Sequence, residues 1–354
     1  MKERVVVAMS GGVDSSVAAA LLKKRGYEVV GITMCFNLKD AAGRHPICCG
    51  LQGIEDARRV AQKIGIRHYV LNMQKLLEER VIKDFCAEYL RGRTPNPCIR
   101  CNQYLKFDTL LKKALSLEAR YLATGHYARI IRGRSYLLKK AKDKFKDQSY
   151  FLYRLSQNQL KHILFPLGNY TKSEVRALAR KFDLSVAQKP GSQEICFLPE
   201  GDYRQFIKTR LSSPLRPGKV VDIEGNVLGG HQGVAFYTIG QREGLGIARG
   251  YPLYITELDP GKNEITVGTK DDACKREFLA KDMHFIDKPI KKRVVLKVKI
   301  RYNHKEALAQ VLPSERGVKV SFKKPQFAIT PGQSAVFYEK DEVLGGGIID
   351  RVLR

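Results

Sequence analysis

A polar turn near the start of the chain has the residue types of a phosphate-binding loop. Residues 10–15 read Ser-Gly-Gly-Val-Asp-Ser; the apolar, β-branched run 4–9 precedes them and the helix-forming run 16–22 follows. A turn from a strand into a helix exposes backbone N–H groups and the positive end of the helix dipole, which together suit an anion. Asp14 could bind magnesium or cap the helix. The turn lacks the lysine of a Walker A motif and the third glycine of a dinucleotide fingerprint, so an ordinary capped turn is the alternative.

Three cysteines could carry a second kind of chemistry. Cys98 and Cys101 form a C-x-x-C motif in a proline-rich stretch, and Cys196 lies in another loop-like stretch. One interpretation is that these cysteines are packed or incidental. A second is a redox-active set of thiols whose pKa Arg93 and Arg100 would lower. A third is ligation of a metal or an iron–sulfur cluster by the three cysteines, with one coordination position open. Zinc fits less well, because a closed structural zinc site needs a fourth ligand.

The other cysteines carry weaker signals. The chain has eight cysteines, and in a cytosolic protein they are not expected to form structural disulfides. Cys48 and Cys49, together with His45, could form a second metal site, although plain loop thiols are the simpler interpretation. Cys35 and Cys86 are expected to be packed in the interior, and Cys274 has no assigned role.

The elements around the turn predict an α/β domain with a doubly wound parallel sheet. Apolar strands alternate with amphipathic helices, as βα units require. In such sheets ligands bind beyond the carboxyl ends of the strands, where both the 10–15 turn and Met34 fall. The predicted strands are 4–9, 28–34, 68–71 and 121–124, and the predicted helices include 54–63, 74–90 and a helix from a capping box at Thr171–Glu174 to residue 181. Residues 91–102 are predicted to be a loop, and 128–139 a hairpin.

The composition changes near residue 212, which predicts a domain boundary. Prolines and glycines follow, and then short β-branched segments such as 219–223, 234–239, 294–301, 317–322 and 334–338. Short strands between turn signals are typical of a small barrel or sandwich. We therefore predict three domains: a catalytic nucleotide domain at 1–212, a small central β domain at 213–275 and a C-terminal β-barrel at 276–354.

The charge of the chain favours a polyanionic partner. Among 354 residues, 63 lysines and arginines oppose 36 acidic residues, which gives a net charge of +27. Such an excess, spread along the chain, indicates nucleic acid, although a merely basic protein is the alternative. No apolar run approaches a membrane span, and residue 4 already begins a strand, so we expect a cytoplasmic protein without a membrane partner.

Taken with its neighbours, the turn resembles the PP-loop of ATP pyrophosphatases, which cleave ATP between the α and β phosphates. Behind it, a set of motifs occurs in one order and resembles the tRNA-specific 2-thiouridylase (MnmA) family from end to end. The motifs are Thr94–Pro97, Cys101-Asn102, Ala123–Ala128, Asp147–Tyr150, Gly191–Phe197 and Gly240–Arg242. Each motif alone is only moderately specific, but their joint order is not expected by chance.

This resemblance implies an ATP-dependent tRNA-uridine 2-sulfurtransferase. The enzyme would bind ATP and Mg²⁺, adenylate O2 of the wobble uridine at position 34 of certain tRNAs, and let sulfur displace AMP. Uracil O2 is a poor leaving group until it is adenylated, and a loop with magnesium would neutralise the departing pyrophosphate. The reacting base must leave the stack to enter a pocket. The implied ATP-binding residues are Ala8, Met9, Ser10, Gly11, Gly12, Val13, Asp14, Ser15, Met34 and Gly125.

The resemblance also implies roles for the cysteines and for tRNA-binding residues. Cys101 corresponds to the nucleophile and Cys196 to the carrier of a persulfide from a relay protein, and the pair would form a disulfide during turnover. Asn96, Pro97 and Cys98 would line the pocket of the target base. The implied tRNA contacts are His126, Asp147, Gln148, Ser149, Arg301, Tyr302 and Gln333, for which plain solvated surface residues are the alternative.

Cys98 departs from the family pattern, because most members have aspartate there. With Cys101 and Cys196 it resembles related thiolation enzymes in which three cysteines hold a 4Fe–4S iron–sulfur cluster. We therefore expect such a cluster, with free sulfide as the sulfur donor, and the persulfide relay is its rival. Two other function classes are weighed: a PP-loop synthetase acting on a small molecule, and a nucleic-acid-binding protein with an inactive nucleotide fold. Neither explains the basic charge, the three cysteines and the intact Ser10, Asp14 and Ser15 together.

Overall fold

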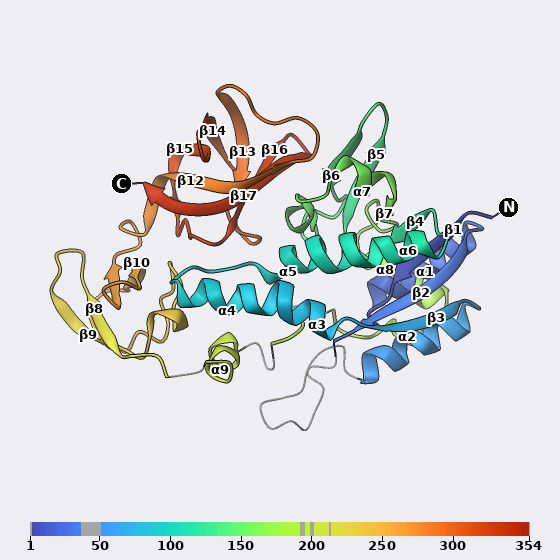
Figure 1. Ribbon diagram of the computed structural model, residues 1–354, viewed down its shortest axis with the longest axis horizontal. Helices are drawn as coiled ribbons and strands as arrows, with labels where there is room; N and C mark the ends of the chain where they lie inside the picture. Colours follow the sequence, from blue (N-terminus) through green and yellow to red (C-terminus); the bar gives the residue numbers. More distant parts are fainter. Residues whose placement is uncertain (1, 37–50, 192–194, 199–201, 212–213, 354) are drawn as a thin grey trace. The chain divides into compact units, whose positions relative to one another are not determined.

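The computed structural model describes residues 2–36, 51–191, 195–198, 202–211 and 214–353. The chain forms two compact units, which we describe separately. Unit 1 comprises Met1–Val81, Pro97–Tyr203 and Asp341–Val343, and unit 2 comprises Ile82–Asn96, Arg204–Lys340 and Leu344–Arg354. Figure 1 draws the elements of both units in sequence colours.

Unit 1 is built on a parallel sheet of five strands, in the order β3-β2-β1-β4-β7. All four pairings are parallel. The strands are β1 (Arg4–Ala8), β2 (Glu28–Cys35), β3 (Arg67–Asn72), β4 (Tyr121–Ala123) and β7 (Ile163–Leu164). Because β1 is central and apolar on both faces, Val5, Val6 and Val7 are fully buried. The predicted doubly wound parallel sheet is confirmed.

Helices connect these strands and bury them. They are α1 (Val13–Lys24), α2 (Leu51–Lys63), α3 (Gln74–Leu77), α7 (Gln157–Lys161) and α8 (Lys172–Lys181); a π-helical stretch at Glu78–Ile82 then leads into α4 (Lys83–Leu90), which belongs to unit 2. Helix α8 begins with the predicted capping box, in which Thr171 and Glu174 bond to each other's backbone N–H groups. Val175 and Ala179 of α8 belong to the same buried cluster as Val17 and Leu21 of α1. The start of α8 is therefore fixed beside the first helix of the fold.

The C-x-x-C segment is helical, which corrects the predicted loop at 91–102. Helix α5 (Pro97–Arg100) continues into a π-helix over Cys101–Leu110 and then into α6 (Leu111–Ser116). Pro97 occupies the first helical position, where its missing N–H costs nothing. Its presence therefore indicates a helix start and not a continuing loop. A β-hairpin follows, formed by β5 (Ala128–Arg132) and β6 (Tyr136–Lys140), as predicted.

Unit 2 contains a four-stranded sheet in the order β10-β11-β8-β9. Its strands are β8 (Gly218–Val221), β9 (Val227–His231), β10 (Tyr254–Asp259) and β11 (Glu264–Gly268), and helix α9 (Tyr203–Lys208) precedes them. The predicted strand at 234–239 is wrong, because Val234–Phe236 form a 3₁₀ turn. Their apolar side chains are buried, so burial and not strand pairing accounts for their composition.

The C-terminal part of unit 2 is a closed barrel. Its strand order is β12-β15-β14-β13-β16-β17, and a further pairing of β12 with β17 closes the ring. The strands are β12 (Cys274–Phe285), β13 (Val294–Lys299), β14 (Ala307–Ser314), β15 (Gly317–Phe327), β16 (Ser334–Glu339) and β17 (Glu342–Leu353). Phe278, Val298, Val320 and Phe337 fill its interior. The structure thus decides between the barrel and the sandwich in favour of the barrel.

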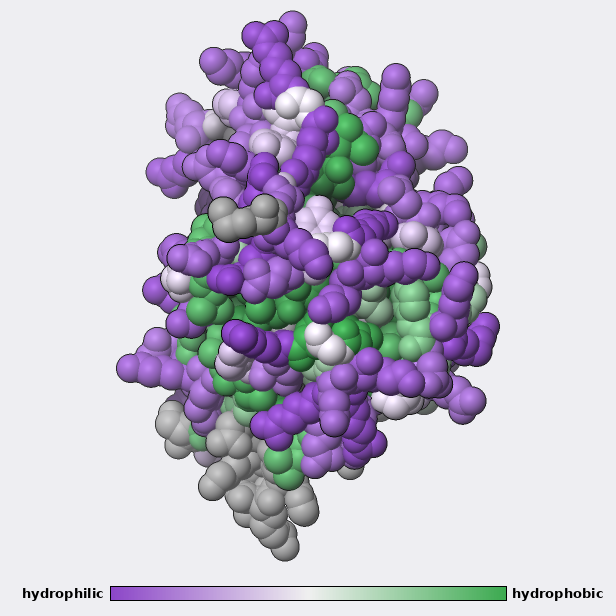
Figure 2. All heavy atoms as spheres, turned by 90° about the vertical axis from the view of Figure 1, so that its right-hand side faces the viewer, coloured by the Kyte–Doolittle hydropathy of each residue, from purple (hydrophilic) through white to green (hydrophobic). Residues whose placement is uncertain are grey.

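The surface is largely hydrophilic on the face that Figure 2 draws, with hydrophobic side chains gathered near its middle. Within the described ranges, no helix combines the length and the apolar character that crossing a bilayer requires.

Candidate functional site

The 10–15 turn is folded around its own hydroxyl groups. The Ser10 N–H donates to Ser15 Oγ at 3.1 Å, and the hydroxyls of Ser15 and Ser16 both donate to the Gly12 carbonyl, at 3.2 and 2.9 Å. Gly12 precedes α1 in an extended conformation, and no side chain caps the helix there. The N–H groups of a helix's first turn have no partners within the helix, so this end is suited to an anion.

Two glycines allow neighbouring segments to approach this turn closely. Gly11 has a φ of 74°, and a Cβ there would lie 2.2 Å from the Gly53 carbonyl oxygen of α2. A Cβ on Gly125, which follows β4, would lie 2.7 Å from the Ser15 nitrogen. The structure therefore brings Gly125 against the turn, as expected of an ATP-binding residue. Ala8 ends β1, Met9 is buried and Met34 is partly exposed near the end of β2.

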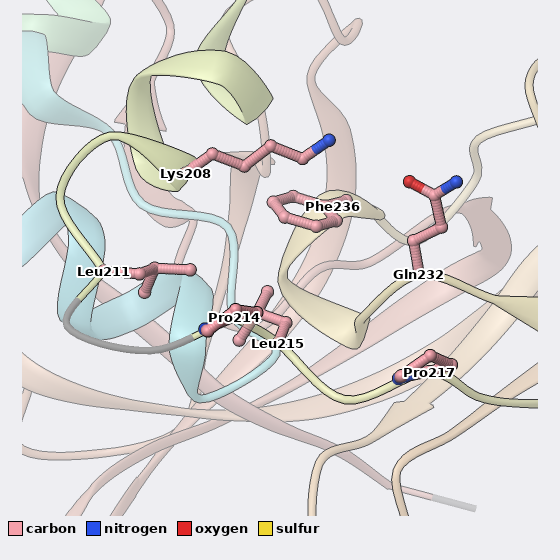
Figure 3. A pocket seen from close by; sticks show the side chains of 7 residues that line it. All are labelled: Lys208, Leu211, Pro214, Leu215, Pro217, Gln232 and Phe236. Atoms are coloured by element: carbon pink, nitrogen blue, oxygen red, sulfur yellow. The ribbon is translucent and has the colours of Figure 1, made fainter. Parts of the chain in front are cut away.

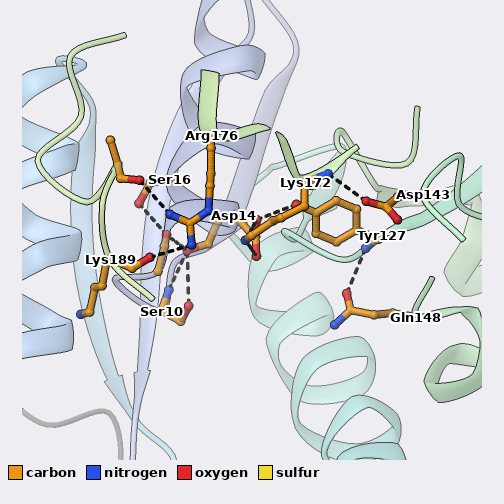
Figure 4. Close-up of polar contacts among 12 residues, drawn as sticks. Ser10, Asp14, Ser16, Tyr127, Asp143, Gln148, Lys172, Arg176 and Lys189 are labelled. Carbon is orange, nitrogen blue, oxygen red and sulfur yellow. Dashed lines mark hydrogen bonds and ion pairs between the residues drawn. The ribbon is translucent and has the colours of Figure 1, made fainter. Parts of the chain in front are cut away.

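The carboxylate of Asp14 is held by two residues that the sequence did not reveal. Lys172 Nζ lies 2.6 and 2.7 Å from the two carboxylate oxygens, and the Tyr127 hydroxyl donates to Oδ1 at 2.7 Å. Burial, followed by the nearby Asp14 charge, raises the pKa of Tyr127, so its hydroxyl keeps its proton. Figure 4 shows Lys172 and Tyr127 directed at Asp14.

A second ion pair lies at the same turn. Lys189 Nζ is 2.6 Å from Asp56 Oδ2 and 3.5 Å from the Gly11 carbonyl oxygen. Burial alone would raise the pKa of Asp56, but its hydrogen bonds with Lys189 and Gln52 outweigh burial and lower it. Arg176 of α8 donates to the carbonyls of Ala187 and Lys189 (Figure 4). Residues 172–189 thus supply several cations to the neighbourhood of the turn.

One signal in the sequence could have drawn attention to Lys172. It is the first residue of a helix that a capping box marks clearly. A cation at the positive end of a helix is unfavourable, unless a carboxylate or another anion compensates for it. The partner itself could not be identified, because Asp14 lies 158 positions away.

The thiols of Cys98 and Cys196 lie near each other in unit 1. Both residues are exposed, whereas Cys101, the first residue of the π-helix, is buried. Although Cys98 has exposed surface, burial of its sulfur and, second, the nearby Cys196 raise the pKa of the thiol to about 11, against the opposing effect of Lys106. Cys98 is therefore a neutral thiol at physiological pH.

This result corrects the redox interpretation for Cys98. Its pKa is raised and not lowered by its surroundings. Arg100 donates to the side chain of Gln103. Arg93 bonds to Glu88 and to the Asp350 and Ile349 carbonyls within unit 2. These two arginines are engaged elsewhere, so they do not activate this thiol.

The iron–sulfur cluster expected on Cys98, Cys101 and Cys196 gains no support from the described part of the chain. Throughout the part of the chain that the structure describes, no three side chains of histidine, cysteine, aspartate or glutamate are grouped closely enough to hold a metal ion. No disulfide is seen among the cysteines that the structure describes. Cys48, Cys49 and His45, considered for a second metal site, lie outside the described residues.

His126, a predicted tRNA contact, is held in an aromatic environment. Its Nδ1 lies 2.7 Å from Thr124 Oγ1, and its ring is 5.8 and 5.9 Å from those of Phe107 and Phe165. Burial of the ring, and then the Lys106 charge, lower the pKa of His126 well below its usual value. The imidazole is therefore neutral, although the residue keeps some exposed surface.

Two other predicted tRNA contacts are buried. Asp147 accepts hydrogen bonds from the backbone of Ala141 and from the backbone and hydroxyl of Ser149. Ser149 is fully buried. Their side chains serve the local turn and are not available to RNA as they lie here. Gln148 is partly exposed, and its Oε1 accepts the Tyr127 N–H at 3.0 Å (Figure 4).

Two of the predicted residues of unit 2, Gln333 and Arg301, donate hydrogen bonds to backbone carbonyls. Gln333 is buried, and its Nε2 donates to the carbonyls of Thr94 and Pro95, immediately before Asn96. Arg301 donates to the Ile239 carbonyl at 2.7 Å and to the Thr330 hydroxyl. Lys299 Nζ lies 5.3 Å from the centre of the Tyr302 ring. Gln333 thus positions the residues before the C-x-x-C segment.

Unit 2 also contains a cavity, shown in Figure 3, that includes none of the predicted site residues. Its lining is mostly apolar, with one cation and one amide. The lining residues are Lys208, Leu211, Pro214, Leu215, Pro217, Gln232 and Phe236.

Family models match the chain in three consecutive parts. They are described as a tRNA methyl transferase HUP domain over residues 3–200, a tRNA methyl transferase PRC-barrel domain over 204–269 and an aminomethyltransferase beta-barrel domain over 275–349. A chain from Carboxydothermus hydrogenoformans, named tRNA-specific 2-thiouridylase MnmA, is 50% identical over 99% of both chains. A second relative, from Caldanaerobacter subterraneus subsp. tengcongensis, is named tRNA-specific 2-thiouridylase MnmA 2. It is 53% identical, and the match again covers 99% of both chains.

Likeness to solved structures is weaker. A 4-thiouridine synthetase–RNA complex with bound ATP covers 59% of this chain and 49% of its own at 17% identity, with a TM-score of 0.36. That score is too low to support an argument. The protein family is therefore assigned from the sequence identity to the named relatives and not from the solved structures.

Proposed function

The chain belongs to the MnmA family of tRNA-specific 2-thiouridylases, and on this premise we propose that it converts the wobble uridine of tRNA to 2-thiouridine with ATP. The proposal rests on one observation: the chain is about 50% identical in sequence to relatives with that name, over nearly their whole length. The alternative, a PP-loop synthetase of small molecules, is not favoured by these relatives. The expected resemblance is thus confirmed, and the steps below are proposals.

The 10–15 turn binds the phosphates of ATP in this proposal. Backbone N–H groups at the start of α1 and the hydroxyls of Ser10 and Ser15 supply donors. Gly125 and Met34 lie at the ends of β4 and β2, where the adenosine part would be bound. A hard carboxylate such as Asp14 suits Mg²⁺, which would supply positive charge to the phosphates when bound.

The first chemical step is adenylation of the uridine. Uracil O2 attacks the α-phosphorus of ATP, the bond from that phosphorus to the bridging oxygen breaks, and pyrophosphate leaves. The base loses its N3 proton, so that C2 becomes part of an isourea-like adenylate. AMP is then a good leaving group, whereas the original O2 was not.

The second step delivers sulfur through the cysteines. A donor protein places a sulfur atom on Cys196 as a persulfide, whose terminal sulfur attacks C2 and displaces AMP. The Cys101 thiolate then attacks Cys196 Sγ, so the sulfur–sulfur bond breaks and 2-thiouridine regains its N3 proton. A Cys101–Cys196 disulfide remains, and an external thiol reduces it. We derive no step through an iron–sulfur cluster, because no group of three side chains that could hold a metal ion is found among the described residues.

The remaining predicted residues bind the RNA in this proposal. Asn96, Pro97 and Cys98 line the pocket of the flipped base, and His126, Gln148, Arg301 and Tyr302 contact the tRNA. Gln333, Asp147 and Ser149 act by shaping the backbone beside these contacts, since their side chains are buried and bonded within the protein.

The test is nucleoside mass spectrometry of unmodified tRNA after incubation with the protein, ATP, Mg²⁺ and a persulfide-carrying donor protein. We expect 2-thiouridine at the wobble position and one AMP for each sulfur transferred. ATP cleavage that depends on a small metabolite, with unmodified tRNA left unchanged, would instead favour the synthetase.

A further inference from the structure

Lys172 has no role in the function proposed above, yet its surroundings are unusual. It begins α8, and its side chain is only 17% exposed. It lies at the positive end of the helix, where a cation is disfavoured. An anion must compensate for its charge, and the compensation here comes from a residue of the phosphate-binding turn.

The contact between Lys172 and Asp14 consists of several hydrogen bonds. One Nζ reaches both carboxylate oxygens, and the Tyr127 hydroxyl adds a third hydrogen bond. The backbone around this contact is fixed independently. The Lys172 N–H donates to Asp143 Oδ2 at 2.9 Å, and the capping box holds the turn of helix that follows. The long side chain can therefore move while its helix stays in place.

The turn itself contains no cation. Residues 10–15 have serine, glycine, valine and aspartate, so no lysine of the Walker type is present to meet the outer phosphates. Cleavage between the α and β phosphates places negative charge on the departing pyrophosphate, and a cation close to that charge lowers the barrier. Of the neighbouring cations described above, Lys189 pairs with Asp56, which lies outside the turn, and only its longer 3.5 Å contact reaches the Gly11 carbonyl. Arg176 donates to backbone carbonyls. Lys172 is paired with the turn.

We propose that Lys172 is a catalytic residue that contacts the β- and γ-phosphates of ATP, and that in the ATP-free protein it is stored on Asp14. ATP exchanges the carboxylate partner of Nζ for phosphate oxygens. Tyr127 keeps its hydrogen bond to Asp14, so the carboxylate stays in position. This inference rests on the proposed function only in requiring that the protein use ATP.

The decisive experiment compares ATP with AMP, because AMP lacks the two phosphates that Lys172 is expected to contact. Isothermal titration calorimetry without tRNA is carried out on Lys172→Met and on the wild-type protein. Losing one charge-assisted contact should weaken ATP binding by about 10- to 100-fold, with AMP binding nearly unchanged. With tRNA present, pyrophosphate release should slow by about 100-fold, and Lys172→Arg should recover part of it.

The matched control is Lys142→Met. Lys142 Nζ lies 2.9 Å from Glu174 of the same helix, in an exposed ion pair away from the turn. This variant should bind both nucleotides as the wild-type protein does. If Lys172→Met does not fold, Lys172→Gln carries the test, since its amide can still donate to Asp14 without a charge.

Two results for Lys172→Met would overturn the proposal. One is an equal loss of affinity for ATP and AMP, which would indicate a merely structural role, and the other is an unchanged affinity for ATP. Failure of the proposed function is distinguishable. If wild-type protein makes no 2-thiouridine but discriminates ATP from AMP through Lys172, the function is wrong and the phosphate contact stands.

Discussion

At the scale of single residues, Cys98 lies where the resemblance described above leads us to expect an aspartate. Its thiol is held neutral by burial, with the Cys196 thiol as a second cause. A neutral thiol is a poor nucleophile, because attack needs the thiolate. This agrees with the function proposed above, in which Cys98 lines the base pocket and the transfer chemistry belongs to Cys101 and Cys196.

The reactivity of Cys98 should follow its raised pKa. With a pKa of about 11, it should react with iodoacetamide at pH 7 about 100-fold more slowly than an ordinary thiol. The rate should climb steadily as the pH rises toward 11, since the thiolate fraction grows tenfold per pH unit below the pKa. Mass spectrometry of timed alkylation measures this directly. A rate that is already maximal near pH 7 would show that the thiol is activated.

Replacing Cys98 should discriminate the two sulfur routes. Under the persulfide route, Cys98→Asp, which restores the residue of most family members, should keep thiolation within about threefold, because no step uses this sulfur. The protein purified without oxygen should be colourless. About four iron and four sulfide per chain, lost together with activity in the variant, would restore the cluster hypothesis.

Replacing either Cys101 or Cys196 should impair sulfur transfer without stopping ATP cleavage. Cys101→Ser and Cys196→Ser should each lower 2-thiouridine formation by at least about 100-fold. Pyrophosphate release in the presence of tRNA should persist, because adenylation uses neither thiol. Cys274→Ser is the control, since its sulfur donates to the Lys270 carbonyl and a hydroxyl can do the same. Loss of pyrophosphate release in either variant would contradict this order of steps.

At the scale of elements, the phosphate-binding turn depends on how closely α2 approaches it. The Gly11–Gly53 contact leaves no space for a side chain, and Gly11 also has a positive φ. These two effects can be separated at Gly65. It has a similar φ of 65°, and a Cβ added there would meet nothing within 4 Å.

Gly11→Ala and Gly65→Ala therefore form a matched pair. Gly65→Ala should lose about 1 kcal/mol of unfolding free energy, because alanine is strained at positive φ. Gly11→Ala should lose more, because its Cβ would also meet the Gly53 carbonyl oxygen. Only Gly11→Ala should also weaken ATP binding, by at least about 10-fold, since the turn must shift away from α2. Denaturant melts and calorimetry measure the two effects. Equal ATP affinity in both variants would show that the turn tolerates the displacement.

Sequence and structure agree where an element depends on neighbouring residues. Strands β1 to β4, the capping box at Thr171 and the strand-to-helix turn at 10–15 were predictable, because each depends on residues within a few positions. Lys172 against Asp14 was not, since the contact spans 158 positions. The loop predicted at 91–102 is wrong in its second half because Pro97 begins a helix. The strand predicted at 234–239 is wrong because its apolar residues are buried in a 3₁₀ turn, without strand pairing.

At the scale of the whole molecule, the net charge of +27 is the dominant property. The basic residues are distributed along the chain and do not form a terminal tail. An excess of this size attracts a polyanion from a distance and contributes affinity that depends on salt. The charge therefore supports tRNA as the partner but does not by itself select the wobble uridine.

Binding of unmodified tRNA should weaken steeply with salt. The logarithm of the association constant should fall linearly with the logarithm of salt concentration, by about 0.7 to 0.9 for each phosphate contact released. Filter binding between low and physiological salt gives this slope, and AMP binding, with one phosphate, serves as the comparison. A flat response for tRNA would remove the electrostatic argument.

The π-helix at Cys101–Leu110 has a consequence for sequence variation. Its hydrogen bonds skip one residue more than those of an α-helix, so the segment accommodates an additional residue per turn. Deleting a single residue between Asn102 and Leu110 would allow ordinary α-helical pairing. The helix would become more regular, yet Cys101 would be rotated about the axis relative to Leu111. Deletions here should thus be selected against even where they improve the helix.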